Sequence, residues 1–196
     1  MYRRTGIGLV AAVIVISPIG MHTANAHGHT DSPPSRQQLC AQGAVPGCGP
    51  IRWEPQSVEG RKGFPETGPA DGTICSGGHP QFHQLDEPRA GTGWPTTRIA
   101  SGAVNDINWT ITVRHSTSAF RYFITKDGWN PALPLTRQSL VLQPLLSVPF
   151  HGKQPPPTLT HQVGIPAAKT GRHMLVAVWD IADTGNAFYA CSDIQL

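Results

Sequence analysis

Two histidines could form a metal site if the chain is processed before the first of them. His27 follows Ala24-Asn25-Ala26, a small-residue A-x-A motif of the kind that ends a secretory signal. A chain beginning at His27 would carry an α-amino group with a pKa of about 7.7–8.0, low enough for a metal ion to displace its proton near neutrality. That amine and the Nδ1 atom of the same residue could chelate one ion.

His115 is our candidate for the third nitrogen ligand, because it ends a stretch, 107–115, whose apolar and polar residues alternate as in a strand. Amine and imidazole nitrogens in a tetragonal arrangement suit copper, which also leads the affinity order of the divalent metals. We expect His29 to be an exposed side chain beside this site rather than a ligand. A single histidine is usually a core or surface residue, so the assignment depends on the cut before His27.

The first 26 residues have the other features of a signal peptide. Arg3 and Arg4 precede an apolar run, 6–16, that is too short to span a membrane. A retained anchor is the alternative. Removing residues 1–26 leaves a single domain, 27–196, whose formal net charge falls from +3 to +1 with the loss of the two arginines. The signal peptide predicts a secreted, extracellular protein, which we expect to be a monomer. The processed chain has no run of basic residues, so we expect it to bind neither nucleic acid nor membrane.

Four cysteines in an exported chain favour two disulfides. Of the three possible connectivities we favour Cys40–Cys48, which closes a short Gly/Pro loop, and Cys75–Cys191, which ties an early loop to the last strand. A zinc site is the alternative, but the spacing lacks a C-x2-C pair.

The remaining sequence predicts an all-β fold. Residues 35–95 are dense in Gly, Pro, Asp and Ser, which indicates a long loop region with a short helix near Ser35. Strands are predicted as an edge strand within 27–34 and then near 107–115, 120–125, 144–150, from 158 onward, 173–179 and 187–196. Short strands separated by turns are typical of a β-sandwich.

Several motifs, in order along the whole of 27–196, resemble the bacterial lytic polysaccharide monooxygenases. These form auxiliary activity family 10, formerly called chitin-binding protein or carbohydrate-binding module family 33. The motifs are the His27-Gly28 start with Pro33, and the segments 53–59, 62–65, 68–72, 114–117, 122–126 and 179–189.

The resemblance implies a fibronectin-III-like or immunoglobulin-like β-sandwich with a large loop region between the first strands. It also implies one copper ion per chain, an external electron donor, and O2 or H2O2 as co-substrate. The implied activity is oxidative cleavage of crystalline polysaccharide, with C1 oxidation. The segment after Trp53 looks more like the chitin-active branch than the cellulose-active one.

The resemblance also implies residue roles. His27 and His115 match the family's copper-binding histidine brace, and Phe188 matches the aromatic residue on the axial side of the metal. Glu59 matches an acid that positions the oxygen species, and Trp179 matches a buried aromatic near the copper. The positions that match the surface around the copper are Trp53, Glu54, Pro55, Thr112, Asp183 and Asn186. An exposed Trp53 could pack its ring face on a sugar ring.

Val113 departs from the family, which typically has alanine two residues before the second histidine. Valine would crowd the open axial position, so a chitin-binding protein without turnover is a second hypothesis. An exported copper carrier is a third, and it would need no exposed Trp53. Glu54 and Glu59 lie close in sequence, but nothing else indicates a glycosidase pair.

Overall fold

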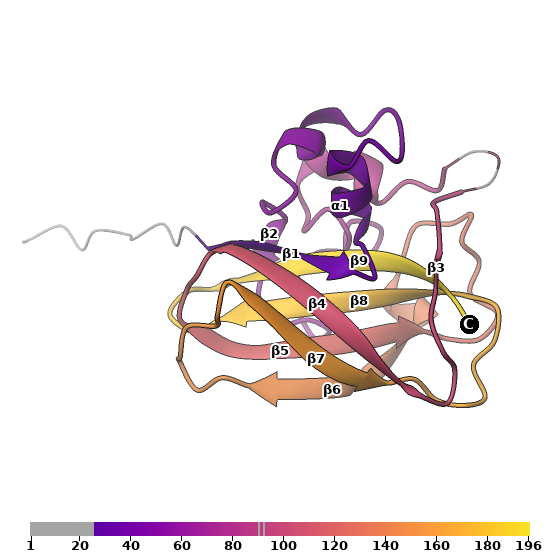
Figure 1. Cartoon of the computed structure of the whole chain (residues 1–196). Helices are drawn as coiled ribbons and strands as arrows, with labels where there is room; N and C mark the ends of the chain where they lie inside the picture. The colour runs from indigo at the N-terminus through magenta and orange to yellow at the C-terminus, as the bar shows by residue number, and fades with distance from the viewer. Residues whose placement is uncertain (1–25, 90, 92) are drawn as a thin grey trace, which may run out of the picture.

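The computed structural model describes residues 26–89, 91 and 93–196, so the proposed signal up to residue 25 lies outside the described part. Figure 1 shows two sheets packed face to face. The smaller sheet contains, in spatial order, β1 (His27–Ser32), β4 (Val104–Val113) and β7 (Thr158–Gly164). The larger contains β2 (Glu59–Arg61), β9 (Asn186–Gln195), β8 (Arg172–Ile181), β5 (Thr117–Thr125) and β6 (Leu140–Pro149), with β3 (Thr97–Arg98) parallel to β9. The predicted β-sandwich is confirmed.

The longer strands form where the pattern predicts them, with shifted ends. The strand predicted at 107–115 begins at Val104 and ends at Val113, so His115 lies two residues beyond β4. The sequence did not indicate β2 and β3, because strands this short carry no alternation of their own. They form by pairing with β9, Glu59 opposite Phe188 and Thr97 opposite Ile194.

The central strands β8 and β9 of the larger sheet are buried on both faces, which explains the continuous apolar run in β8. Leu175, Ala177 and Trp179 face the smaller sheet. Met174 and Val176 face the loop region and pack with Phe64 from it. Alternate residues of one strand therefore belong to two separate parts of the core.

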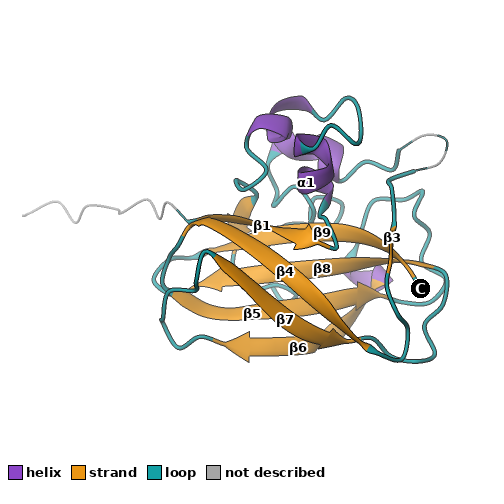
Figure 2. Cartoon of the chain, viewed as in Figure 1, coloured by secondary structure: helices purple, strands orange, loops and turns teal. Residues whose placement is uncertain are grey.

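The loop region contains α1 (Arg36–Ala41) and 3-10 turns at Gly49–Trp53 and Pro80–Leu85. A third 3-10 turn, Arg137–Ser139, precedes β6. Figure 2 shows α1 and neighbouring helical turns gathered above β1 and β9. Among the described residues, no helix is both long enough and apolar enough to span a membrane.

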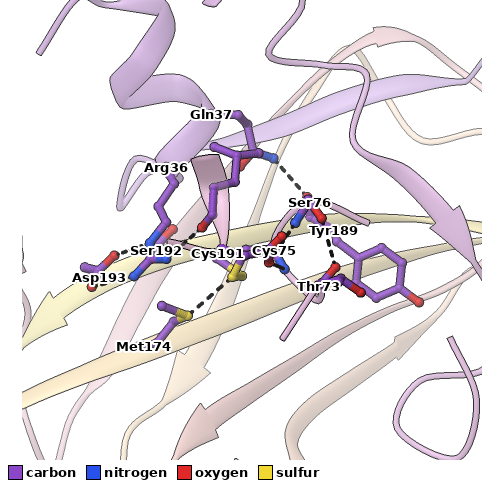
Figure 3. The surroundings of a disulfide bond; sticks show 12 residues. Arg36, Gln37, Thr73, Cys75, Ser76, Met174, Tyr189, Cys191, Ser192 and Asp193 are labelled. Carbon is purple, nitrogen blue, oxygen red and sulfur yellow. Dashed lines mark hydrogen bonds and ion pairs between the residues drawn. A yellow bond between two sulfur atoms is a disulfide. The ribbon is translucent and has the colours of Figure 1, made fainter. Parts of the chain in front are cut away.

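Two disulfides fasten the loop region, as predicted: Cys40–Cys48 within it, and Cys75–Cys191 between it and β9. Figure 3 shows the second bond beside Met174, whose Sδ lies 3.6 Å from Cys75 Sγ. Nearby, Arg36 Nε donates to the buried carboxylate of Asp193 at 2.7 Å.

Arg137 binds the backbone of the loop region between residues 65 and 69. Its guanidinium donates to the carbonyl oxygens of Pro65, Thr67 and Pro69 at 2.6, 2.5 and 2.9 Å. It also donates to Asp71 Oδ1 at 2.7 Å. The loop region therefore has a defined shape despite its few regular elements.

Removing the two disulfides should have unequal effects on stability. Cys75–Cys191 spans 116 residues and Cys40–Cys48 spans 8. On the loop-closure model, the double alanine variant of the first pair should lose about 4–5 kcal/mol of unfolding free energy and that of the second about 2–3. Urea unfolding of both variants checks this. Equal losses would show that loop length does not determine the stabilisation.

Candidate functional site

His27 and His115 are brought to the same end of the molecule by the pairing of β1 with β4. His27 lies opposite Val113, two residues before His115. Figure 1 shows the start of β1 meeting the end of β4. Thr112 is exposed at this end, and its Oγ1 lies 3.4 Å from the carbonyl oxygen of His27.

His115 has one ring nitrogen directed at an acid. Its Nδ1 lies 3.1 Å from Asp183 Oδ1, within ion-pair distance but without hydrogen-bond alignment. The ring is partly buried and Asp183 is exposed. An acid beside Nδ1 leaves Nε2 as the nitrogen available to an ion.

Aromatic rings lie behind His27. The Phe188 ring centroid is 6.4 Å from that of His27, and the Trp179 centroid is 5.1 Å from that of Phe188. Both aromatic side chains are fully buried. A Cβ atom at Gly28 would lie 2.9 Å from Ile111 Cδ1 and 3.1 Å from Trp179 Cζ3, so any side chain at this position would press on these two packed residues.

Glu59 is positioned by β2 and by Asn186. It lies opposite Phe188 in the sheet, and Asn186 Nδ2 donates to its Oε1 at 2.7 Å. His79 Nε2 contacts the Glu59 carbonyl oxygen. Sequence reasoning missed His79, and no local pattern could have revealed it, because the contact joins residues 20 apart across a loop.

Trp53 is the most exposed large apolar side chain of the described residues, at 78%. The Arg52 guanidinium lies 4.9 Å from its ring centroid, a cation–π contact that sequence reasoning also missed. Glu54 and Pro55, which follow, are half-buried. Trp53 therefore belongs to the surface and not to the core.

The prediction of an exposed His29 is wrong. The side chain is buried, its Nε2 lies 3.1 Å from Asp31 Oδ1, and burial lowers its pKa in spite of that carboxylate. β1 is an edge strand of the smaller sheet, as predicted, but its edge is not open. The loop region contacts it, with the Gly28 amide donating to the Gln56 carbonyl at 3.1 Å.

The donor set fits copper only if His27 contributes two nitrogens. Within the part of the chain that the structure describes, no three His, Cys, Asp or Glu side chains are grouped as a metal site. His27 and His115 supply two imidazoles at one end of the sandwich, and the α-amine of a chain beginning at His27 would be the third donor. An all-nitrogen set of this kind suits copper.

Comparison with known proteins identifies the fold and the family. The family model for "Lytic polysaccharide mono-oxygenase, cellulose-degrading" matches residues 27–194. GlcNAc-binding protein A of Shewanella oneidensis is 40% identical over 196 residues, covering 100% of this chain and 41% of that protein. The chain thus spans less than half the length of that relative.

Two solved structures have the same architecture. An auxiliary activity family 10 lytic polysaccharide monooxygenase from Streptomyces lividans is 54% identical with a TM-score of 0.85, covering 87% of this chain and all of that one. A CBM33 from Bacillus amyloliquefaciens in complex with Cu(I) is 37% identical with a TM-score of 0.78, covering 87% of this chain and 99% of that one. The chain therefore belongs to the lytic polysaccharide monooxygenases of auxiliary activity family 10.

Proposed function

We propose that this chain is a secreted, copper-dependent monooxygenase that cleaves crystalline polysaccharide by oxidation, with chitin as the preferred substrate. The observation that carries the proposal is the pairing of β1 with β4, which puts His27 at the end of the sandwich where His115 follows Val113. Similarity to a structure in complex with Cu(I) supports copper as the metal. The proposal requires processing before His27.

His27 and His115 would hold the copper. The bound metal would supply the redox chemistry that activates O2 or H2O2 with electrons from an external donor. The Asp183 carboxylate faces His115 Nδ1, so Nε2 of His115 would be the atom that binds the metal. Phe188 would exclude water from the side of the site nearest the core, since its ring is fully buried beside His27.

Glu59 would hold or move a proton at the site. Its Oε1 accepts from Asn186, which leaves Oε2 free to accept a hydrogen bond or release a proton. Opposite Phe188 in the sheet, Glu59 is half-buried and fixed in direction. These are the properties of a group that positions a co-substrate.

The surface around the site would bind the polymer. An exposed indole can lie on the apolar face of a sugar ring, and Trp53 is 78% exposed. Glu54, Pro55, Thr112, Asp183 and Asn186 would add polar contacts. A relative named GlcNAc-binding protein A favours chitin, whereas the matching family model is described as cellulose-degrading, so cellulose is the alternative substrate.

A chitin-binding protein without turnover is the second candidate. Val113 supports it, because this side chain is 39% exposed and lies directly opposite His27. Its branched side chain would narrow access to a metal bound there.

Processed, copper-loaded protein with ascorbate should release C1-oxidised aldonic acids from β-chitin, because hydroxylation at C1 breaks the glycosidic bond. Mass spectrometry of the soluble products checks this, and His115→Ala is the inactive control. Products from cellulose alone would overturn the chitin preference. Adsorption to chitin without products from either polymer would favour the binding protein, and Val113→Ala would then be the variant to assay.

A single extra residue before His27 should abolish tight copper binding, because the α-amine becomes an amide. Copper at about 100 times its Kd should stabilise the processed chain by about 2.7 kcal/mol and leave the extended chain unchanged. Thermal unfolding with and without copper measures both. Equal stabilisation of the two chains would refute the amine ligand.

Trp53→Ala should weaken adsorption to β-chitin, because it removes the exposed indole, while Trp53→Phe should retain most of it. Binding isotherms of the variants on β-chitin check this, with copper affinity as the matched control. Unchanged adsorption of Trp53→Ala would place the residue outside the binding surface.

A further inference from the structure

The turn between β8 and β9, residues 182–185, connects two groups of the proposed site. Within the turn, Asp183 Oδ1 lies 3.1 Å from His115 Nδ1. Directly after it, Asn186 Nδ2 donates to Glu59 Oε1 at 2.7 Å. Figure 1 shows this turn, in yellow, at the same end of the sandwich as the start of β1. The position of the turn therefore determines how an acid faces one candidate ligand and how the second acid is held.

Lys62 spans this turn from one side to the other. It directly follows β2 in the loop region, and its backbone amide donates to the Gly185 carbonyl oxygen at 2.8 Å. Its side chain extends to the opposite side of the turn, where Nζ donates to the Ile181 carbonyl oxygen at 2.5 Å. One residue thus bonds both the last residue of the turn and the last residue of β8.

A further hydrogen bond joins the turn to the segment that follows His115. The Ala182 amide donates to the carbonyl oxygen of Ser116 at 2.8 Å, and Ser116 is the residue directly after His115. The turn is therefore held between two parts of the chain. Lys62 connects it to the loop region, and Ser116 connects it to the candidate ligand.

The Lys62 ammonium is paired with a carbonyl oxygen and not with an acid. The side chain is half-buried, and none of the described Asp or Glu side chains lies within ion-pair distance of it. Among the described residues, the Ile181 carbonyl oxygen is the only acceptor of its ammonium group. A charged donor makes a stronger hydrogen bond than a neutral one. The turn that it holds therefore accounts for a lysine at this position.

We infer that Lys62 is a positioning residue of the proposed site, because it holds the turn that carries Asp183 and leads into Asn186. The inference rests on the proposed function, in which His115 binds the metal and Glu59 holds or moves a proton. The Asp183 side chain is 58% exposed, so packing contributes little to its placement and the backbone of the turn determines it. Without the Nζ bond, Lys62 would hold the turn from one side only, and the acid would move relative to the imidazole.

Three substitutions separate the bond from the bulk of the side chain. Lys62→Met keeps an unbranched chain of similar length but has no N–H group, so it removes the bond to Ile181 and leaves the backbone bond to Gly185. Lys62→Arg keeps a charged donor and should retain the position of the turn. Lys126→Met removes an exposed lysine just beyond the C-terminal end of β5, and it is the matched control.

Nuclear magnetic resonance of the processed, metal-free protein tests the inference. The amide of Ala182 should exchange about tenfold faster in Lys62→Met, the effect of losing one charge-assisted hydrogen bond, and the ring resonances of His115 should shift. Lys62→Arg and Lys126→Met should match the wild type in both. Unchanged exchange and unchanged His115 resonances in Lys62→Met would overturn the inference. An equal acceleration at amides throughout both sheets would also overturn it, since the role would then be general stability.

Copper-loaded protein tests the connection with the metal site. The Cu(II) electron paramagnetic resonance spectrum of Lys62→Met should differ from that of the wild type, and the spectrum of Lys62→Arg should match it. A Lys62→Met spectrum identical to that of the wild type would overturn the positioning role. Wild-type protein that binds no copper would overturn the proposed function instead, whereas the metal-free measurement decides on its own whether Lys62 places the turn beside His115.

Discussion

The antiparallel pairing of β1 with β4 is the constraint on which the site depends. It places His27 opposite Val113, two residues before His115, and the Phe188 ring centroid lies 6.4 Å from that of His27. The pairing needs the inner face of β1 to lie close against Trp179, which the absence of a side chain at Gly28 permits. The position of the candidate ligand His27 therefore depends on the close packing that its neighbour Gly28 permits.

The second requirement is to fix the loop region, a segment with few regular elements, against the sandwich. Backbone pairing is scarce there, so side chains and a disulfide take its place: Cys75–Cys191 fastens the segment to β9, and Asp193 accepts from Arg36 in the same area. β2 then carries Glu59 to a position opposite Phe188. The loop region and the sandwich thus contribute one polar and one aromatic group to the same site.

The fold could be predicted from the sequence where burial imposes a period, as in β4 and β8, and where cysteines must pair. The positions of β2, β3 and His29 could not. Each depends on contacts with residues distant in the sequence or on tertiary burial: β9 pairs with the two short strands, and the loop region contacts β1 at Gly28, next to His29. The motifs located His27 and His115 but not His79, because its contact with the Glu59 carbonyl oxygen joins residues 20 apart in the sequence.

The contacts of Arg137 have a consequence for how this chain can change over time. Three of its hydrogen bonds end on carbonyl oxygens, at Pro65, Thr67 and Pro69. Every residue type has a carbonyl oxygen, so these bonds survive most substitutions in the segment they bind. Substitutions in residues 65–69 can alter the side chains of this segment while Arg137 preserves its backbone conformation. The exposed side chains of this segment can therefore change without a matching loss of stability.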